Sequence, residues 1–165
     1  MTTVSELSVP RFRGLGAVGV EVGGEVRSPG GAALGRLLSR LLVDAGQRVD
    51  VSELMDAVWG DRGAARSVST LESHLHRLRR FLEPERARGQ VSALLVAEIG
   101  GYRLAVDGDR IESVCFRRQA REASELLAAG EARAAVERAE QARALWRGQP
   151  MRRSGCRSGP GPPTA

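Results

Sequence analysis

The sequence predicts an α+β protein in which a small antiparallel sheet, three helices and a β-hairpin are followed by two more helices. Three observations support this prediction. Short extended runs punctuated by glycine fill residues 12–27. Leucines then recur at helical spacing in the segments that reach residue 82. From residue 112 onward the composition shifts to alanine-rich amphipathic segments.

The leading sheet is predicted by the runs "FRGL", "AVGVEV" and "EVR". Gly23 and Gly24 stand between two of these runs, and both tolerate the positive φ angles of a tight hairpin turn. Residues 1–10 show no periodicity and are expected to be a frayed lead-in.

Two helices are expected next. "GAALGRLLSRLLVDAG" places one apolar stripe on a helix that ends at Gly46, with Arg36, Arg40 and Asp44 on its other side. "DVSELMDAVWG" begins with Asp50 and has Glu53 three residues later, the pattern of a capping box. The expected buried residues of the first stripe are Leu34, Leu37, Leu38, Leu41, Leu42 and Ala45.

A third helix is predicted over residues 66–82, and its polar face is unusual. At about 100° per residue, the apolar residues of this helix fall in one narrow arc facing the core. The opposite ridge presents hydrogen-bond donors in side chains long enough to reach phosphates and base edges. The arc consists of Val68, Leu71, Leu75, Leu78 and Leu82, with Glu72 near its border. The ridge and its borders consist of Arg66, Ser69, Thr70, Ser73, His74, His76, Arg77, Arg79 and Arg80.

Two strands are predicted in "VSALLVAEIGGYRLAV", on either side of Gly100-Gly101. A sheet, three helices and a terminal hairpin form the element order of a winged helix-turn-helix domain, which we assign to residues 11–107. In that fold the third helix fits the major groove of DNA. The alternative is an ordinary solvated helix face whose arginines only maintain solubility.

Residues 112–150 predict a helical hairpin of the tetratricopeptide-like kind. Small residues along a seam let two helix backbones approach closely, but one such hairpin cannot bury its outer surface alone. Residues 151–165 are rich in Gly, Pro and Ser and are expected to be a disordered tail. The seams consist of Phe116, Ala120, Ala123 and Leu127 in one helix, and Ala135, Ala139, Ala142 and Trp146 in the other.

Composition and motifs argue against several classes of function. The formal net charge is +5, and every basic residue other than the two histidines is arginine. No apolar run approaches the roughly 20 residues of a membrane span, and no signal peptide is evident, so we expect a cytoplasmic protein. Cys115, Cys156, His74 and His76 fit no familiar zinc spacing. We expect no metal, no cofactor and no catalytic residues, hence no enzyme.

The motifs "AVWGD", "TLESHLHRLRRFL" and "GGYRL" resemble the OmpR/PhoB-type winged-helix DNA-binding domain. More narrowly, they resemble the Streptomyces antibiotic regulatory protein family of transcriptional activators. "FRRQAREASELLAAGEARAAVERAEQARALWRGQP" looks like the start of the bacterial transcriptional activation domain that follows in that family. The resemblance covers about residues 11–150.

The resemblance implies a sequence-specific activator, of the kind that controls biosynthetic gene clusters for antibiotics. Such a protein dimerises on double-stranded DNA at direct repeats in promoters and recruits RNA polymerase. The contact positions carried over in the helix are Thr70, Ser73, His74, His76, Arg77, Arg79 and Arg80. Tyr102 and Arg103 lie in the wing after the glycine turn, and Arg103 is the expected contact there. The OmpR/PhoB-type class is associated with phosphorelay signal transduction, but no phosphoacceptor domain is recognised in these residues, so we expect no phosphorylation switch.

The sequence departs from the family pattern in two places. Glu98 stands where relatives commonly carry a wing arginine, so the wing contact is expected to fall to Arg103 alone, or Glu98 to read an exocyclic amine. The helical pattern also ends after one helix pair, near Pro150, which suggests a truncation or a change of reading frame. Two alternatives therefore stand beside the activator: a DNA binder that lacks activation and competes with relatives, and a protein-interaction module acting through the helical hairpin.

Overall fold

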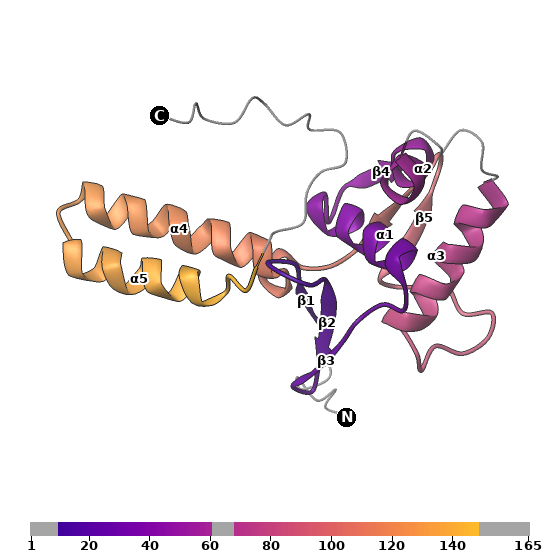
Figure 1. Cartoon of the computed structure of the whole chain (residues 1–165), viewed down its shortest axis with the longest axis horizontal. Coiled ribbons are helices and arrows are strands. Elements are labelled where there is room, and N and C mark those ends of the chain that lie inside the picture. The colour runs from indigo at the N-terminus through magenta and orange to yellow at the C-terminus, as the bar shows by residue number, and fades with distance from the viewer. Residues whose placement is uncertain (1–9, 61–67, 149–165) are drawn as a thin grey trace, which may run out of the picture.

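The computed structural model describes residues 10–60 and 68–148. The predicted α+β fold is confirmed: within these ranges the chain forms two small antiparallel sheets and five α-helices (Figure 1). The elements in chain order are β1 Arg11–Arg13, β2 Gly19–Val22, β3 Glu25–Arg27, α1 Ala32–Val43, β4 Arg48–Asp50, α2 Val51–Trp59, α3 Val68–Leu82, β5 Leu95–Glu98, β6 Gly101–Leu104, the 3-10 turn Gly108–Arg110, α4 Glu112–Ala128 and α5 Ala132–Ala144.

The first sheet is the predicted antiparallel meander. Its order is β1-β2-β3, with Phe12 opposite Val20 and Val22 opposite Glu25. The turn between β2 and β3 consists of Gly23 and Gly24, whose φ angles are 59° and 84°. The glycine pair was therefore a reliable signal, because only this residue adopts positive φ twice in succession at little cost.

The second sheet contains one more strand than the sequence predicted. The expected β5–β6 hairpin is present, and β4 pairs with β6 to complete the order β4-β6-β5. β4 was missed because it has three residues, of which only Val49 is fully buried, too few to show a period of two. The hairpin turn is also shifted by one residue: it consists of Ile99 and Gly100, while Gly101 belongs to β6.

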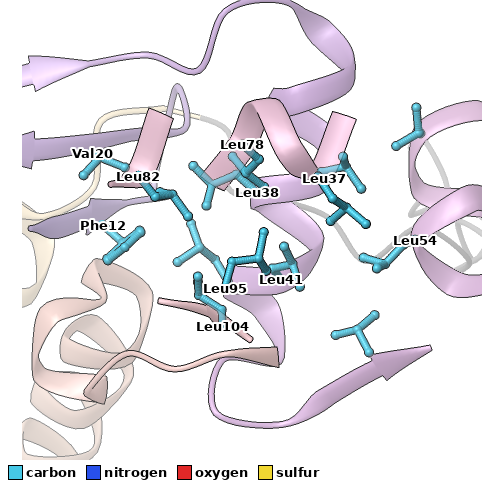
Figure 2. Close-up of a cluster of buried hydrophobic side chains, with 14 of the residues drawn as sticks. Phe12, Val20, Leu37, Leu38, Leu41, Leu54, Leu78, Leu82, Leu95 and Leu104 are labelled. Atoms are coloured by element: carbon cyan, nitrogen blue, oxygen red, sulfur yellow. The ribbon is translucent and has the colours of Figure 1, made fainter. Parts of the chain in front are cut away.

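The core lies where α1, α3 and the second sheet meet (Figure 2). Leu37, Leu38 and Leu41 of α1 are fully buried, as are Leu95 and Leu104 of the second sheet. Phe12 and Val20 bring the first sheet into the same cluster. The leucine stripe predicted for α1 is therefore confirmed, although Ala45 follows the helix and is only half-buried.

Arg40 corrects the expectation that it lies on the solvent side of α1. The side chain is buried and donates to the carboxylates of Asp44 and Glu53, the latter at 2.8 Å. Burial alone lowers the pKa of the guanidinium, but the hydrogen bonds to both carboxylates raise it above its ordinary value. Glu53 also accepts from the backbone N–H of Asp50 in the predicted capping box. The start of α2 thus covers this side of α1.

The helical hairpin has two unlike faces. Only the alanines Ala123, Ala135 and Ala142 are buried between α4 and α5. The larger seam residues border an open apolar groove of about 590 Å³, and the Leu127 and Trp146 side chains are 64% and 45% exposed there. The predicted seams are thus confirmed in part, because small residues make the close contact and large residues remain at the groove surface.

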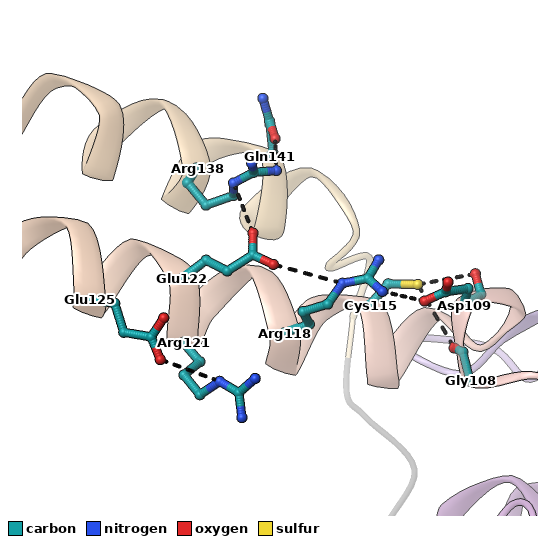
Figure 3. A network of polar contacts seen from close by, with 9 residues as sticks. All are labelled: Gly108, Asp109, Cys115, Arg118, Arg121, Glu122, Glu125, Arg138 and Gln141. Atoms are coloured by element: carbon teal, nitrogen blue, oxygen red, sulfur yellow. Dashed lines mark hydrogen bonds and ion pairs between the residues drawn. The ribbon is translucent and has the colours of Figure 1, made fainter.

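The polar side of the hairpin carries a chain of ion pairs (Figure 3). Arg118 contacts Asp109 and Glu122, and Glu122 in turn lies 3.1 Å from Arg138 of α5. These pairs link the two helices and the 3-10 turn on one face. The charged side chains of this face are paired with one another, whereas the apolar side chains of the groove are exposed.

Glu112 joins the first sheet to both ends of the hairpin. Its Oε2 accepts from the backbone N–H groups of Gly14 (2.9 Å) and Leu15 (3.0 Å), and its Oε1 pairs with Arg147 beyond α5. The backbone N–H of Arg147 donates to the carbonyl of Leu15 at 2.8 Å. Because the Glu112 side chain is only 8% exposed, this carboxylate is shielded from water while it satisfies several donors.

We expect Glu112→Ala to destabilise the protein by about 1–3 kcal/mol, because the N–H groups of Gly14 and Leu15 would lose their acceptor. Urea unfolding followed by circular dichroism measures this change. Glu125→Ala is the matched control. The Glu125 side chain is 68% exposed, and its ion pair with Arg121 is long, at 3.6 Å, so its loss should cost less than about 0.5 kcal/mol. Equal effects of the two substitutions would contradict the role given to Glu112.

Candidate nucleic-acid interface

The buried leucines of α3 determine which of its side chains face water. Leu71, Leu75 and Leu78 are fully buried, and Leu82 is 7% exposed. Since these residues recur every three or four positions, they occupy one side of the helix and leave the opposite side in solvent. Val68 does not follow the prediction: it is 49% exposed, because it is the first residue of α3 and precedes the first buried turn.

The exposed side of α3 carries most of the predicted contact residues. Within the described ranges, the side chains of His76, Arg77 and Arg80 form no hydrogen bond or ion pair. Their donors therefore face solvent. The exposed members of the predicted set are Ser69, Ser73, His76, Arg77 and Arg80, and Thr70 is half-buried.

Two neighbouring details qualify this surface. The Ser73 hydroxyl donates to the backbone carbonyl of Ser69 at 3.0 Å, which leaves its oxygen as an acceptor on the same face. Glu72, expected near the core border, is exposed and adds one negative charge beside these serines. Arg66 was also predicted to contact DNA, but it lies outside the described residues.

His74 and Arg79 were predicted at the borders of the ridge, and both face neighbouring elements. The His74 ring lies 5.8 Å from the ring of Trp59 in α2. The Arg79 Nε donates to the Leu95 carbonyl of β5 at 3.1 Å, and its guanidinium lies 5.5 Å from the ring centroid of Tyr102. A helical wheel cannot assign such border positions, because the elements packed on either side decide which way they point.

The wing arginine is neutralised within the wing. The Nε of Arg103 lies 2.5 Å from the Oε1 of Glu98, and both side chains are about one-third exposed. In the register of the hairpin, Glu98 is opposite Gly101 and Val96 is opposite Arg103, so the pair is diagonal across the two strands. Glu98, the acid by which this wing departs from the family pattern, therefore forms an ion pair with Arg103.

A second wing arginine, Arg48, was missed by sequence reasoning. It is opposite Arg103 in the β4–β6 register and is exposed. Its Nη1 donates to the carbonyl of Ile99 at 2.7 Å, and its Nη2 lies 2.9 Å from Asp50. No sequence signal pointed to this residue, because β4 itself was not recognised.

The part of the chain that the structure describes does not have the features of a metal site or of a membrane-spanning helix. There, no group of three or more His, Cys, Asp or Glu side chains is arranged to hold a metal ion. None of the helices in these ranges is long and apolar enough to cross a membrane. Cys156, one of the four hypothetical metal ligands, lies outside the described residues.

Comparison with known families identifies two domains in this architecture. Residues 31–104 match the family "Transcriptional regulatory protein, C terminal", and residues 111–158 match the "Bacterial transcriptional activator domain". The transcriptional regulator RedD of Streptomyces coelicolor is 33% identical over 141 residues, which cover 81% of this chain. The chain belongs to the Streptomyces antibiotic regulatory protein family.

Further relatives of this chain support the family assignment. The regulatory protein AfsR of Streptomyces griseus is 31% identical over 86% of the chain, and the regulatory protein DnrI of Streptomyces peucetius is 32% identical over 70%. The chain spans 38% of RedD, 14% of this AfsR and 44% of DnrI, so it corresponds to less than half the length of each.

A solved structure supports the fold. Mycobacterium tuberculosis EmbR, in complex with a low affinity phosphopeptide, superposes with a TM-score of 0.74 over 87% of this chain and 37% of that chain. The sequence identity is 21%, so this likeness concerns the fold alone. The arrangement of sheets and helices in this chain is therefore shared with EmbR.

The second sheet requires glycine at position 101. A Cβ at Gly101 would lie 2.3 Å from the Val49 carbonyl oxygen of the adjacent strand β4. We therefore expect Gly101→Ala to force β4 and β6 apart and to lower the thermal unfolding midpoint clearly, as overpacking by about 1–3 kcal/mol does. Gly30→Ala is the control, because nothing lies within 4 Å of its Cβ. Wild-type stability of both variants would show that the sheet is looser than described.

Proposed function

We propose that this protein is a sequence-specific transcriptional regulator that binds promoter DNA with α3 in the major groove. The observation that carries the proposal is the outward face of α3, where Arg77, Arg80 and His76 are exposed and unpaired within the described ranges. Membership in a family of transcriptional regulators supports it. We propose a DNA-binding protein and not an enzyme.

The chemistry of this face suits DNA. Arginine donates to phosphate oxygens, and its planar guanidinium also binds O6 and N7 of guanine through two hydrogen bonds. Arg77 and Arg80 are separated by three positions on the helix, so they project from neighbouring turns of the same side. We propose that these two arginines and His76 make the main contacts, with Ser69, Thr70 and Ser73 contacting the backbone.

We also propose domain bounds, partners and a cellular location for the protein. We infer a DNA-binding domain over residues 11–107, a partial activation domain over 112–150 and a tail over 151–165. We propose that two copies bind direct repeats in promoters of biosynthetic gene clusters, that RNA polymerase is recruited there, and that the protein acts in the cytoplasm. The family matches, which end near 104 and begin again at 111, support a boundary between these positions.

The apolar groove of the hairpin favours a second candidate function. Leu127, Val136 and Trp146 are exposed side by side with the alanines of the groove, an arrangement that suits protein contact. Under this alternative, the hairpin docks a protein partner and the arginines of α3 bind an acidic protein instead of DNA. Binding measurements on α3 variants separate these possibilities.

We expect Arg77→Ala to weaken binding to a preferred promoter fragment and to reduce its discrimination against other fragments. A guanidinium that binds a base contributes about 1–3 kcal/mol of discrimination, which corresponds to roughly 5- to 150-fold. A guanidinium that binds a phosphate lowers the slope of log affinity against log salt by about 0.9. Fluorescence anisotropy over a salt series measures both effects.

Arg133→Ala is the matched control for this test. It removes the same charge from the second residue of α5, beside the hairpin turn that lies far from α3 (Figure 1). Its effect on affinity should be small and equal for all fragments. Weak binding by the wild type, uniform across fragments and insensitive to Arg77, would refute the regulator and turn attention to the groove.

We expect Glu98→Gln to strengthen DNA binding and to steepen its salt dependence. The substitution removes a negative charge near the phosphates and frees the Arg103 guanidinium, which is now 2.5 Å from that carboxylate. Glu140→Gln on the exposed side of α5 makes the same charge change away from the wing. If Glu98 instead accepts from an exocyclic amine, the same substitution will weaken binding to the preferred fragment alone.

A further inference from the structure

Arg79 differs from the other arginines of α3 in the direction of its side chain. Arg77 and Arg80 are exposed, but Arg79 is half-buried between α3 and the second sheet. Its Nε donates to the Leu95 carbonyl at 3.1 Å, and its guanidinium carbon lies 5.5 Å from the centre of the Tyr102 ring. The residue therefore contacts the wing and not solvent alone.

The two contacts of Arg79 reach both strands of the wing hairpin. Leu95 is the first residue of β5, and Tyr102 is the second residue of β6, where it is paired with Ala97 of β5 and Val49 of β4. Tyr102 alternates with Arg103, so its ring is on the inner face of the sheet, packed against the core. One side chain thus links the recognition helix to the hairpin from within.

This link is directional, whereas the surrounding leucine contacts are not. Apolar packing between α3 and the sheet stabilises their association, but the hydrophobic effect has no preferred bond direction. A hydrogen bond to one carbonyl and a cation–π contact with one ring specify a geometry. In the described residues, Arg79 provides the polar side-chain contact between α3 and the two wing strands, β5 and β6.

We propose that Arg79 is a positioning residue, which holds the wing at the angle to α3 at which both contact the same DNA segment. This inference rests on the proposed function. A wing held in place meets the DNA without a further loss of conformational freedom when α3 binds, so its contacts add to affinity in full. Arg79 itself need not touch DNA.

The requirement for arginine follows from the two contacts. The planar guanidinium stacks on the Tyr102 ring while its Nε–H donates along a fixed direction. A lysine at position 79 keeps the positive charge but has no equivalent of Nε in that place. Charge and positioning can therefore be separated by substitution.

The test compares Arg79→Lys, Arg79→Gln, Tyr102→Leu and Tyr102→Phe with the wild type on the preferred promoter fragment. Affinity over a salt series and hydroxyl-radical footprints are the readouts, with thermal unfolding to confirm that each variant is folded. We expect Arg79→Lys, Arg79→Gln and Tyr102→Leu to bind about fivefold to tenfold more weakly. The footprint should lose protection at the flank contacted by the wing and keep it where α3 binds. Tyr102→Phe keeps the ring and should match the wild type.

Other outcomes overturn the inference. If Arg79→Lys binds like the wild type, and Arg79→Gln loses affinity with a shallower salt slope, Arg79 is a phosphate contact. If the footprint weakens evenly along the whole fragment in every variant, the role of Arg79 is general stability. Wild-type protein and Arg77→Ala are measured alongside: if the wild type binds no fragment, the proposed function fails and the inference fails with it. If the wild type binds and Arg79→Lys is unchanged, only the inference fails.

Discussion

The burial of the leucine stripe of α3 is the constraint on which the rest of this structure depends. Leu71, Leu75 and Leu78 lose all contact with water against α1 and the second sheet. Each buried leucine contributes about 1.5–3 kcal/mol relative to an exposed one, so rotation of the helix about its axis is strongly disfavoured. Because the helix cannot rotate, Arg77 and Arg80 have to face outward. The same contacts place the second sheet beside the helix, where Arg79 and Tyr102 meet.

The second sheet and α3 differ in how their arginines are paired. The outer face of the second sheet carries Arg48 and Arg103 directly opposite each other, and each is paired with a carboxylate, Asp50 or Glu98. The wing is therefore nearly neutral on the face that its arginines share. The unpaired positive charge therefore belongs mainly to α3. Under the proposed function, a wing without net charge supports DNA binding by its position and shape more than by its attraction for phosphates.

The junction at Glu112 has a consequence for the helical hairpin. Both ends of the hairpin are tied to the loop between β1 and β2, through Glu112 at the start of α4 and Arg147 after α5. The leading sheet is in turn part of the main core through Phe12 and Val20. The hairpin is therefore fixed by its base to the part of the chain that contains α3, while α4 and α5 extend away from it (Figure 1). The helices that form the groove are thus connected to α3 through Glu112, the first sheet and the packed side chains of the core.

Local signals in the sequence determined the helices, the Gly23-Gly24 turn, the hairpin that forms β5 and β6, and the outward side of α3. Each of these depends on periodicity or on one residue's backbone freedom, which neighbours in the chain already specify. The tertiary structure alone decided the rest. β4 is defined by its pairing with β6, where Val49 is opposite Tyr102. Arg40 is buried where its guanidinium donates to Glu53 of α2. His74 and Arg79 face neighbouring elements because Trp59 and Tyr102 lie next to them. Residues at the border of a helix face have no preferred side until another element packs against them, so only the assembled fold could distinguish Arg79 from Arg77.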